Sequence, residues 1–273
     1  MIGIFDSGVG GLSVWREIRR CLPDAPLIYL ADQAHVPYGP RPAHEIIQFT
    51  EACVRELIVR GCRVIVVACN TATAAALPHL RSTFPHIAFV GMEPAVKPAV
   101  ALTQTGVIGV LATHTTVKSE RLASLVQRYA HNVRVIERAC PTWVKLVEHG
   151  EFDQPHAFSQ VAADLHDLLA ARADTLVLGC THFPFLSACI QQATDTHAPN
   201  THIHIVDPAP AVAQQCQRLW RTLAEPVENI TSSKLVLLTT GPAAPFAKLA
   251  FRLLKTSFNL QDHFDITSIV ILH

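Results

Sequence analysis

Short apolar runs alternate along the chain with longer stretches in which apolar residues recur every three or four positions. Runs of about four to eight residues rich in Val, Ile and Leu are typical of buried strands, and the longer spacing is typical of amphipathic helices. Ala43–Arg60 and His156–Arg172 show the helical spacing most clearly. The runs that predict strands are Ile2–Phe5, Leu27–Ala31, Arg63–Ala68, Ile87–Gly91, Thr105–Leu111, Val133–Ala139, Thr175–Gly179, Ile203–Val206 and Lys234–Thr239.

Strands that are apolar throughout and separated by helices predict an α/β fold, with parallel sheets covered on both faces. The chain also carries a weak internal repeat. Arg63–Thr71 aligns with Asp174–His182, since each is an apolar run that ends in a cysteine and a polar residue. We therefore expect two pseudo-symmetric lobes, each a mostly parallel sheet flanked by helices, with the active site in the cleft between them.

Prolines mark the expected boundaries between these lobes. Pro94 and Pro98 suggest a first crossing, and Asp207-Pro208-Ala209-Pro210 suggests the return. The first lobe is then predicted to comprise 1–95 plus 207–273, and the second 96–206.

Composition narrows the class of protein. The 273 residues are 49% hydrophobic, enough for two cores, and 22 basic residues balance 22 acidic ones. Zero net charge gives no electrostatic case for nucleic acid as a main ligand. Apolar stretches such as Arg63–Leu77 are too short to span a bilayer, and the first residues do not form a secretory signal. We expect a cytoplasmic protein that does not bind membranes.

Two of the eight cysteines stand apart by position. No pair forms a Cys-x-x-Cys motif, so most should be reduced, buried and apolar in character. Cys69 and Cys180, however, each end an apolar strand and precede a predicted helix start. Backbone N–H groups and the helix dipole stabilise a thiolate at such a place.

Paired thiols suit the inversion of a carbon stereocentre. Inversion removes a proton from one face and returns one to the other, and a thiol titrates close to neutral pH. His182 could assist Cys180 and Asp6 could assist Cys69. Alternatively, His182 is a capping or core histidine, and Asp6 is the N-cap of the following helix.

Two other uses of these residues are possible. The loop Asp6–Gly11 with Asp32 invites a dinucleotide interpretation, but Ser13 occupies the third glycine position, and Asp6 would repel a pyrophosphate. The loop could equally hold a small carboxylate. Cys69, Cys180 and His182 could bind zinc, but the usual closely paired ligands are missing.

Further polar residues follow other predicted strands. The turn Pro37–Arg41 would place the Tyr38 hydroxyl and backbone N–H groups at the same sheet edge, unless it is a plain surface turn. Thr113, Thr115 and Thr116 offer hydroxyl groups and a helix start in the second lobe. Spacing leaves open whether Glu148 is a solvated helix acid or faces the cleft.

Five segments of the chain form a recognisable set: Gly3-Ile4-Phe5-Asp6-Ser7-Gly8-Val9-Gly10-Gly11-Leu12, Pro37-Tyr38-Gly39, Ala68-Cys69-Asn70-Thr71-Ala72, Gly91-Met92-Glu93-Pro94-Ala95-Val96-Lys97-Pro98-Ala99 and Leu178-Gly179-Cys180-Thr181-His182-Phe183-Pro184. Together they resemble segments of bacterial glutamate racemases, in the family's order, from residue 2 to about 210. Aspartate and hydantoin racemases share the two cysteines but resemble the first two segments less.

The resemblance implies interconversion of L- and D-glutamate without pyridoxal phosphate or metal, supplying D-glutamate for peptidoglycan. It implies that Cys69 deprotonates the D-isomer and Cys180 the L-isomer. Asp6 and His182 resemble the assisting groups, and Glu148 resembles a further acid near Cys180. The predicted substrate-binding residues are Asp6, Ser7, Tyr38, Gly39, Asn70, Thr71, Thr113, Thr116, Thr181 and His182.

Some positions depart from the family pattern. Trp143 stands where we expect a smaller apolar residue, His114 falls at a variable place, and the tail 253–273 matches nothing known to us. The alternatives are a racemase of aspartate or another amino acid and, in another class, a protein that binds DNA gyrase. We expect a homodimer.

Overall fold

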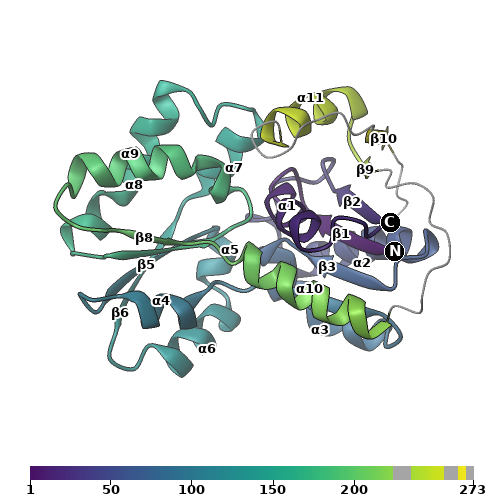
Figure 1. Cartoon of the computed structure of the whole chain (residues 1–273), viewed down its shortest axis with the longest axis horizontal. Coiled ribbons are helices and arrows are strands. Elements are labelled where there is room, and N and C mark those ends of the chain that lie inside the picture. Colours follow the sequence, from purple (N-terminus) through teal and green to yellow (C-terminus); the bar gives the residue numbers. More distant parts are fainter. Residues whose placement is uncertain (224–234, 255–263, 269–273) are drawn as a thin grey trace. The chain divides into compact units, whose positions relative to one another are not determined.

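The computed structural model describes residues 1–223, 235–254 and 264–268. Contacts between residues divide the chain into two compact units. The first comprises Met1–Met92 with Ala209–His273, and the second comprises Glu93–Pro208. Each unit has its own sheet, whose described strands all pair in parallel (Figure 1). We propose that these units are the two lobes expected from the repeat.

The first unit builds a sheet in the order β10-β9-β2-β1-β3-β4. Its elements are β1 (Ile2–Asp6), α1 (Leu12–Cys21), β2 (Leu27–Ala31), α2 (Ala43–Val59), β3 (Val64–Val67), α3 (Asn70–Thr83), β4 (Ala88–Gly91), α10 (Ala209–Leu223), β9 (Leu235–Thr239), α11 (Ala243–Leu254) and β10 (Phe264–Ser268).

The second unit builds a sheet in the order β6-β5-β7-β8. Its elements are α4 (Val96–Leu102), β5 (Val107–Ala112), α5 (His114–Val117), α6 (Glu120–Tyr129), β6 (Arg134–Ala139), α7 (Pro141–Glu148), α8 (Pro155–Ala170), β7 (Thr175–Gly179), the 3₁₀ turn η1 (Phe183–Leu186), α9 (Ser187–His197) and β8 (His204–Val206).

The two sheets share one topology. The order β2-β1-β3-β4 of the first recurs as β6-β5-β7-β8 in the second. The register agrees as well, because Ile2 pairs with Val64 and Ile108 pairs with Thr175. Val64 and Thr175 are equivalent positions of the predicted repeat. The repeat and the α/β fold class are therefore confirmed, and the cysteine after β3 corresponds to the cysteine after β7.

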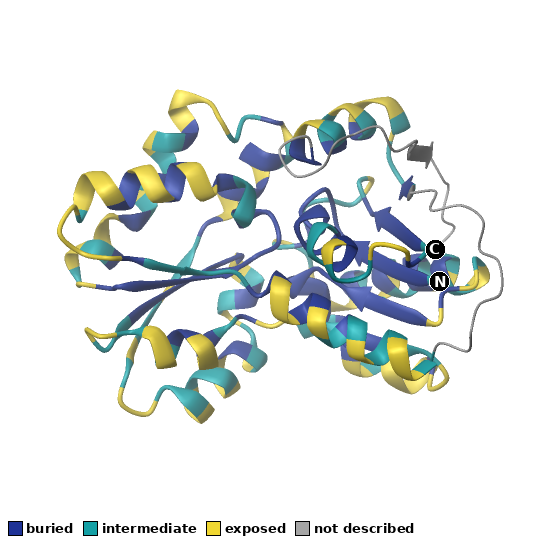
Figure 2. Ribbon diagram, viewed as in Figure 1, coloured by how far each residue is buried: buried dark blue, intermediate teal, exposed yellow. Residues whose placement is uncertain are grey.

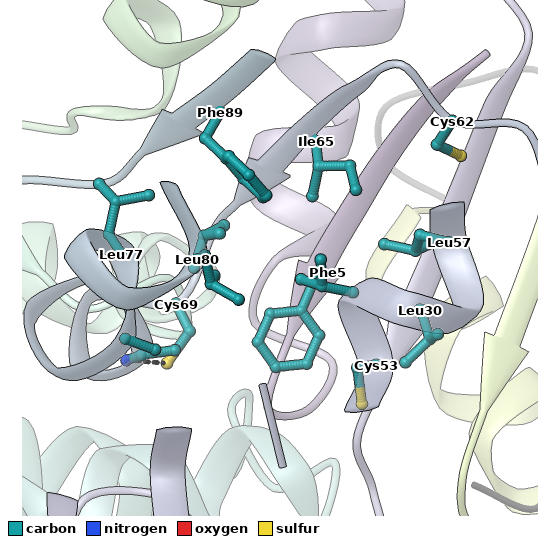
Figure 3. Packing of buried hydrophobic residues seen from close by; sticks show 14 of the residues in the cluster. Phe5, Leu30, Cys53, Leu57, Cys62, Ile65, Cys69, Leu77, Leu80 and Phe89 are labelled. Atoms are coloured by element: carbon teal, nitrogen blue, oxygen red, sulfur yellow. Dashed lines mark hydrogen bonds between the residues drawn. The ribbon is translucent and has the colours of Figure 1, made fainter. Parts of the chain in front are cut away.

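Apolar side chains of the central strands form the cores. In the first unit Phe5, Leu30, Ile65, Leu80 and Phe89 meet between the sheet and helices α2 and α3 (Figure 3). The second unit packs a separate cluster that includes Val96, Ala99, Ile108, Val110, Leu122 and Val177. Burying one such large side chain contributes about 1.5–3 kcal/mol. Figure 2 shows β1, β3 and β7 buried along their whole length, which explains their uninterrupted apolar sequences.

All nine strands predicted from the apolar runs are present, with ends shifted by at most a few residues. Lys234, the predicted start of the ninth, lies outside the described residues, as do 255–263 and 269–273 of the unmatched tail. The tail also contributes β10, which pairs with β9 and which we did not predict. No helix among the described residues is long and apolar enough to cross a membrane.

Asp174 ties the start of β7 to the turn between α4 and β5. Its carboxylate accepts hydrogen bonds from the Thr103 hydroxyl at 2.5 Å and from the backbone N–H groups of Gln104 and Thr105 at 2.7 and 2.8 Å. Burial by itself raises the pKa of Asp174, but these hydrogen bonds outweigh it and the pKa is lowered. The carboxylate is therefore the form that stabilises this corner.

We expect Asp174→Asn to destabilise the protein by about 1.5–3 kcal/mol at pH 7, the contribution of a hydrogen bond to a charged group. Because the folded-state pKa is lowered, this stability is present above the unfolded pKa of about 3.9 and is lost as pH falls through the folded value. Urea unfolding at several pH values should show the gap between wild type and variant narrowing in acid. The exposed Asp24→Asn should change stability by less than about 0.5 kcal/mol. A gap of equal size at all pH values would contradict this account.

Candidate active site

Polar side chains gather at the carboxyl edge of the first sheet, where ligands bind in open parallel sheets. Asp6 is the last residue of β1, Asp32 directly follows β2, and Cys69 lies just beyond β3. The strands stay side by side past their ends, because the N–H of Asp32 donates to the carbonyl of Asp6 at 3.0 Å. Sequence reasoning placed all three at strand ends, and the structure brings them to one edge.

Cys69 is the N-cap of α3. Its Sγ accepts a hydrogen bond from the backbone N–H of Ala72 at 3.4 Å (Figure 3). The same Sγ lies 3.7 Å from the Ser7 hydroxyl. The side chain sits among apolar neighbours and is 6% exposed. Free N–H groups and the positive end of the helix dipole favour an anion at this place, so the local structure stabilises a thiolate.

Asp6 is fully buried beside this cysteine's neighbour Ser7. Its carboxylate accepts hydrogen bonds from the Gly8 N–H at 2.9 Å and from the Ser7 hydroxyl at 3.5 Å, and that hydroxyl also contacts Cys69. Asp6 does not cap α1, whose N-cap is Gly11, so the alternative helix-capping interpretation is wrong. A Cβ at Gly11 would lie 2.6 Å from the Cβ of Asp6, so only glycine allows this close approach.

Asn70 has a buried amide without a partner. The side chain is 4% exposed, and neither Oδ1 nor Nδ2 forms a hydrogen bond to any described residue. Leaving one such group unpaired costs about 1–3 kcal/mol. The neighbouring Thr71 is also buried. The first turn of α3 thus offers a donor and an acceptor that a small polar ligand can satisfy.

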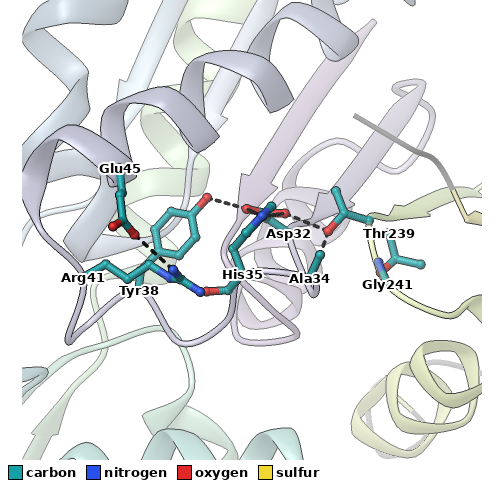
Figure 4. A network of polar contacts seen from close by, with 9 residues as sticks. Asp32, Ala34, His35, Tyr38, Arg41, Glu45, Thr239 and Gly241 are labelled. Carbon is teal, nitrogen blue, oxygen red and sulfur yellow. Dashed lines mark hydrogen bonds and ion pairs between the residues drawn. The ribbon is translucent and has the colours of Figure 1, made fainter. Parts of the chain in front are cut away.

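The Tyr38 hydroxyl is bonded to Asp32. The phenol donates a hydrogen bond to Asp32 Oδ2 at 2.7 Å, and His35 Nδ1 and the Thr240 hydroxyl contact the same carboxylate at 2.9 and 2.7 Å (Figure 4). Burial and the charge of Asp32 raise the pKa of Tyr38 well above its usual range. The phenol therefore stays protonated, and Asp32, considered above only as a ribose ligand, instead anchors the turn that carries Gly39.

The second sheet presents a matching edge. Thr113 follows β5, Cys140 follows β6 and Cys180 follows β7. The Thr113 hydroxyl caps α5 by accepting from the Thr116 N–H at 3.3 Å, and it lies 3.0 Å from the Thr116 hydroxyl. Thr116 and Thr181 are both buried. These positions agree with the polar residues predicted for the second lobe.

The surroundings of Cys180 differ from those of Cys69. The 3₁₀ turn η1 follows Cys180, and the helix α9 begins only at Ser187, so the α-helix start expected directly after Cys180 is wrong. Pro184 in that turn has no N–H to donate. Cys180 Sγ instead lies 3.6 Å from His182 Nδ1, and the side chain is 6% exposed. A histidine thus takes the place that the N–H of Ala72 has beside Cys69.

Glu148 completes a chain of three ionisable groups. Its Oε1 lies 2.5 Å from His182 Nε2, and its side chain is 8% exposed. Burial by itself lowers the pKa of His182, but the hydrogen bonds to Cys180 and Glu148 outweigh it, and the pKa is raised well above its usual range. The imidazole thus lies between the Cys180 thiol and the Glu148 carboxylate, and the hydrogen bonds to both favour its protonated form. Glu148 is therefore a largely buried partner of His182 and not a solvated helix acid.

A turn at the end of α7 holds Glu148 in place. Gly150 adopts a positive φ of 71°. Its N–H donates to the carbonyl of Val147, and the N–H of Glu151 donates to that of Leu146. This pair of bonds is the Schellman motif, in which glycine takes the left-handed conformation. It ends the helix at Glu148, with His149 as the C-cap.

Five other cysteines have raised thiol pKa values. Burial raises the pKa of Cys62 and of Cys216 to about 12 and also raises the pKa of Cys53, Cys140 and Cys189. These thiols stay protonated near neutral pH. In the part of the chain that the structure describes, no three His, Cys, Asp or Glu side chains are arranged to hold a metal ion.

Comparison with known proteins agrees with this arrangement. Residues 3–216 match the family model of Asp/Glu/hydantoin racemases. The chain belongs to this family. The racemase is 47% identical over 254 residues to the glutamate racemase of Roseiflexus sp. (strain RS-1), covering 92% of this chain and 91% of that protein. It is 46% identical over 248 residues to the glutamate racemase of Herpetosiphon aurantiacus, covering 91% and 95%.

Solved structures share the fold of this racemase along its whole length. Escherichia coli glutamate racemase, solved with L-glutamate and the activator UDP-MurNAc-ala, superposes with a TM-score of 0.85. The identity is 32%, and the match covers 100% of this chain and 98% of that one.

Proposed function

We propose that this protein is a glutamate racemase that moves the α-proton of glutamate between Cys69 and Cys180. The carrying observation is the pair of thiols, each just beyond the corresponding strand of a repeated sheet and each bonded to a group that stabilises its anion. Membership of the racemase family and identities of 46–47% to two glutamate racemases support glutamate as the substrate.

The chemistry needs one thiolate and one thiol at the start of each turnover. From D-glutamate, the Cys69 thiolate takes the α-proton, and the Cys180 thiol returns its own proton to the opposite face. From L-glutamate the roles reverse. Each turnover leaves the protonation of the pair exchanged, so no net proton is consumed. We assign Asp6, acting through Ser7, to Cys69, and His182 with Glu148 to Cys180.

The polar groups at the carboxyl edges of the two sheets would bind the substrate. The unpartnered amide of Asn70 can donate to a carboxylate and accept from an ammonium group. The buried hydroxyl groups of Ser7, Thr71, Thr113, Thr116 and Thr181 are suited to the same polar ligand. The proposed set of binding residues also includes Asp6, Tyr38, Gly39 and His182. The turn at Tyr38 would contribute backbone groups and the face of the phenol ring.

Incubation of the purified protein with L-glutamate in heavy water tests this function. The circular dichroism of the substrate should decay to zero while deuterium enters the α-carbon, and D-glutamate should give the mirror-image decay. A panel with aspartate, alanine and glutamine tests the alternative substrates, which should react much more slowly. Retained optical activity with no deuterium incorporation would overturn the proposal.

The biological role follows from the same chemistry. We propose that the enzyme supplies D-glutamate for peptidoglycan, in the cytoplasm and as a homodimer. None of the eight cysteines forms a disulfide bond, which is typical of a protein in a reducing compartment. The resemblance to bacterial glutamate racemases supports the dimer, which light scattering on the purified protein tests. Zero net charge offers nothing in favour of the alternative role on DNA gyrase.

A further inference from the structure

Trp143 is a buried residue that the proposed mechanism does not use. It lies on α7, is fully enclosed, and stands where the family pattern led us to expect a smaller side chain. Its indole N–H donates a hydrogen bond to Asp164 Oδ2 on α8 at 2.9 Å. Its ring packs against that of Phe183 in an edge-to-face arrangement, with ring centroids 4.8 Å apart and planes at 62°. One side chain therefore joins α7 to both α8 and η1.

The elements that Trp143 joins are those that carry the groups behind Cys180. Glu148 is the last residue of α7, and His182 immediately precedes Phe183 at the start of η1. The bond between Glu148 and His182 thus crosses the same junction that the packing of Trp143 on Phe183 holds together.

Asp164, the residue of α8 that accepts the hydrogen bond from Trp143, has further partners of its own. Asp164 also accepts a hydrogen bond from Gln160 at 2.9 Å, and Arg138 of β6 lies 3.8 Å from its other oxygen. An isolated helix as short as α7, which has eight residues, is unstable in water, so tertiary contacts decide its position. The indole is the largest side chain that α7 buries.

We propose that Trp143 is a positioning residue for Cys180, holding α7 against η1 so that Glu148 remains bonded to His182. This inference rests on the proposed function for its catalytic consequence, but its structural part stands without it. A smaller side chain would leave a cavity between α7 and η1 and release the indole's bond to Asp164. The helix would then settle elsewhere, and the 2.5 Å separation of Glu148 and His182 would lengthen.

Isotope effects distinguish positioning from a general loss of stability. When the Cys180 step slows, abstraction from L-glutamate becomes more rate-limiting, and the deuterium isotope effect with α-deuterated L-glutamate should rise. From α-deuterated D-glutamate, abstraction by Cys69 becomes less rate-limiting, and that effect should fall. A lower fraction of folded enzyme moves neither value. We expect Trp143→Leu to shift the two effects in opposite directions and to lower kcat about 10- to 100-fold.

A second measurement needs no activity. The NMR signal of His182, assigned by its loss in His182→Asn, reports the pKa of the imidazole. Glu148 from α7 and Cys180 after β7 are the groups that raise this pKa, so lengthening the bond to Glu148 in Trp143→Leu should lower it. If the wild type racemises nothing, the proposed function fails, yet this titration still tests the role of Trp143.

Milder variants complete the test. Trp143→Phe keeps a ring but loses the N–H and should shift both readouts in the same sense by less. Asp164→Asn keeps an acceptor oxygen and should resemble wild type, whereas Asp164→Leu should resemble Trp143→Phe. Trp220→Phe, in the first unit, is the matched control and should leave both readouts unchanged. The proposal would be overturned if folded Trp143→Phe and Trp143→Leu both showed unchanged isotope effects and an unchanged His182 titration. If Trp143→Leu does not fold, the result for Trp143→Phe alone decides.

Discussion

Replacing either Cys69 or Cys180 with serine should reduce the racemisation of glutamate by a factor on the order of 10²–10⁴, the usual contribution of a general acid–base group. A serine hydroxyl is a far weaker acid than a thiol, so it cannot serve as the anion that removes the α-proton. The equilibrium constant between enantiomers is one, so kcat/KM must fall equally in both directions. Polarimetry or circular dichroism from each pure enantiomer measures the loss.

The single variants should nonetheless differ in hydrogen exchange. Cys180→Ser retains the Cys69 thiolate, which can deprotonate D-glutamate and return a solvent deuteron to the same face. In heavy water this variant should label D-glutamate at the α-carbon faster than it forms the L-isomer, and Cys69→Ser should do the same with L-glutamate. Mass spectrometry after chiral separation distinguishes labelling from inversion.

Cys189→Ser is a suitable control for these substitutions. Cys189 is buried in the same unit as Cys180, and its thiol contacts the carbonyl of Phe152 at 3.3 Å, a bond that a serine hydroxyl can also make. This variant should keep wild-type turnover. If Cys69→Ser or Cys180→Ser also kept it, the two-base mechanism would be wrong.

Replacing His182 with asparagine should lower kcat by about 10²-fold, the lower end of the range for a group that assists proton transfer. The imidazole contacts Cys180 and Glu148 at once, at 3.6 and 2.5 Å, and so links the thiol to the carboxylate. Glu148→Gln, which keeps a hydrogen-bond partner for the ring, should cause a smaller loss. Steady-state kinetics from both enantiomers measures each effect.

The same residue should shape the dependence of stability on pH. The folded-state pKa of His182 is raised above the unfolded value of about 6.5. The stability that this proton contributes is therefore fully present below pH ~6.5 and is lost as pH rises through the folded value. Urea unfolding across this range should show a decline that is smaller in His182→Asn. His156→Asn, which breaks an exposed pair with Glu151, is the control and should keep the decline. Identical slopes in wild type and His182→Asn would contradict the assignment.

The elements of the fold could be predicted because their signals are local. A buried parallel strand such as β3 or β7 is apolar at every position, and a helix such as α2 repeats its apolar positions about every 3.6 residues. The repeat that relates β3 to β7 was visible for the same reason. The strand β10 was not predicted, because its sequence Phe264-Asp265-Ile266-Thr267-Ser268 is not a continuous apolar run.

The polar turns of the site could be predicted only in part. Asp6 ends a strand and precedes a glycine-rich turn, a pattern that suggests either a helix cap or a functional acid, and only the folded turn shows that Gly11 takes the capping place. Tyr38 was expected to offer its hydroxyl to a ligand. Its bond to Asp32 depends on where the turn after β2 folds back, and spacing does not encode that direction.

The two cysteines themselves could be predicted as functional residues from the sequence, because each stands at the end of an apolar strand in a repeated segment. Their chemical surroundings could not be predicted, and they prove to be unlike. Cys69 accepts a hydrogen bond from the backbone N–H of residue 72 at the start of α3. Any residue other than proline would provide this N–H at that position. Cys180 contacts His182, which in turn contacts Glu148, a residue 34 positions before His182 in the chain. That contact exists only because α7 and η1 pack together in the folded unit, and packing between distant segments leaves no periodic mark on the sequence.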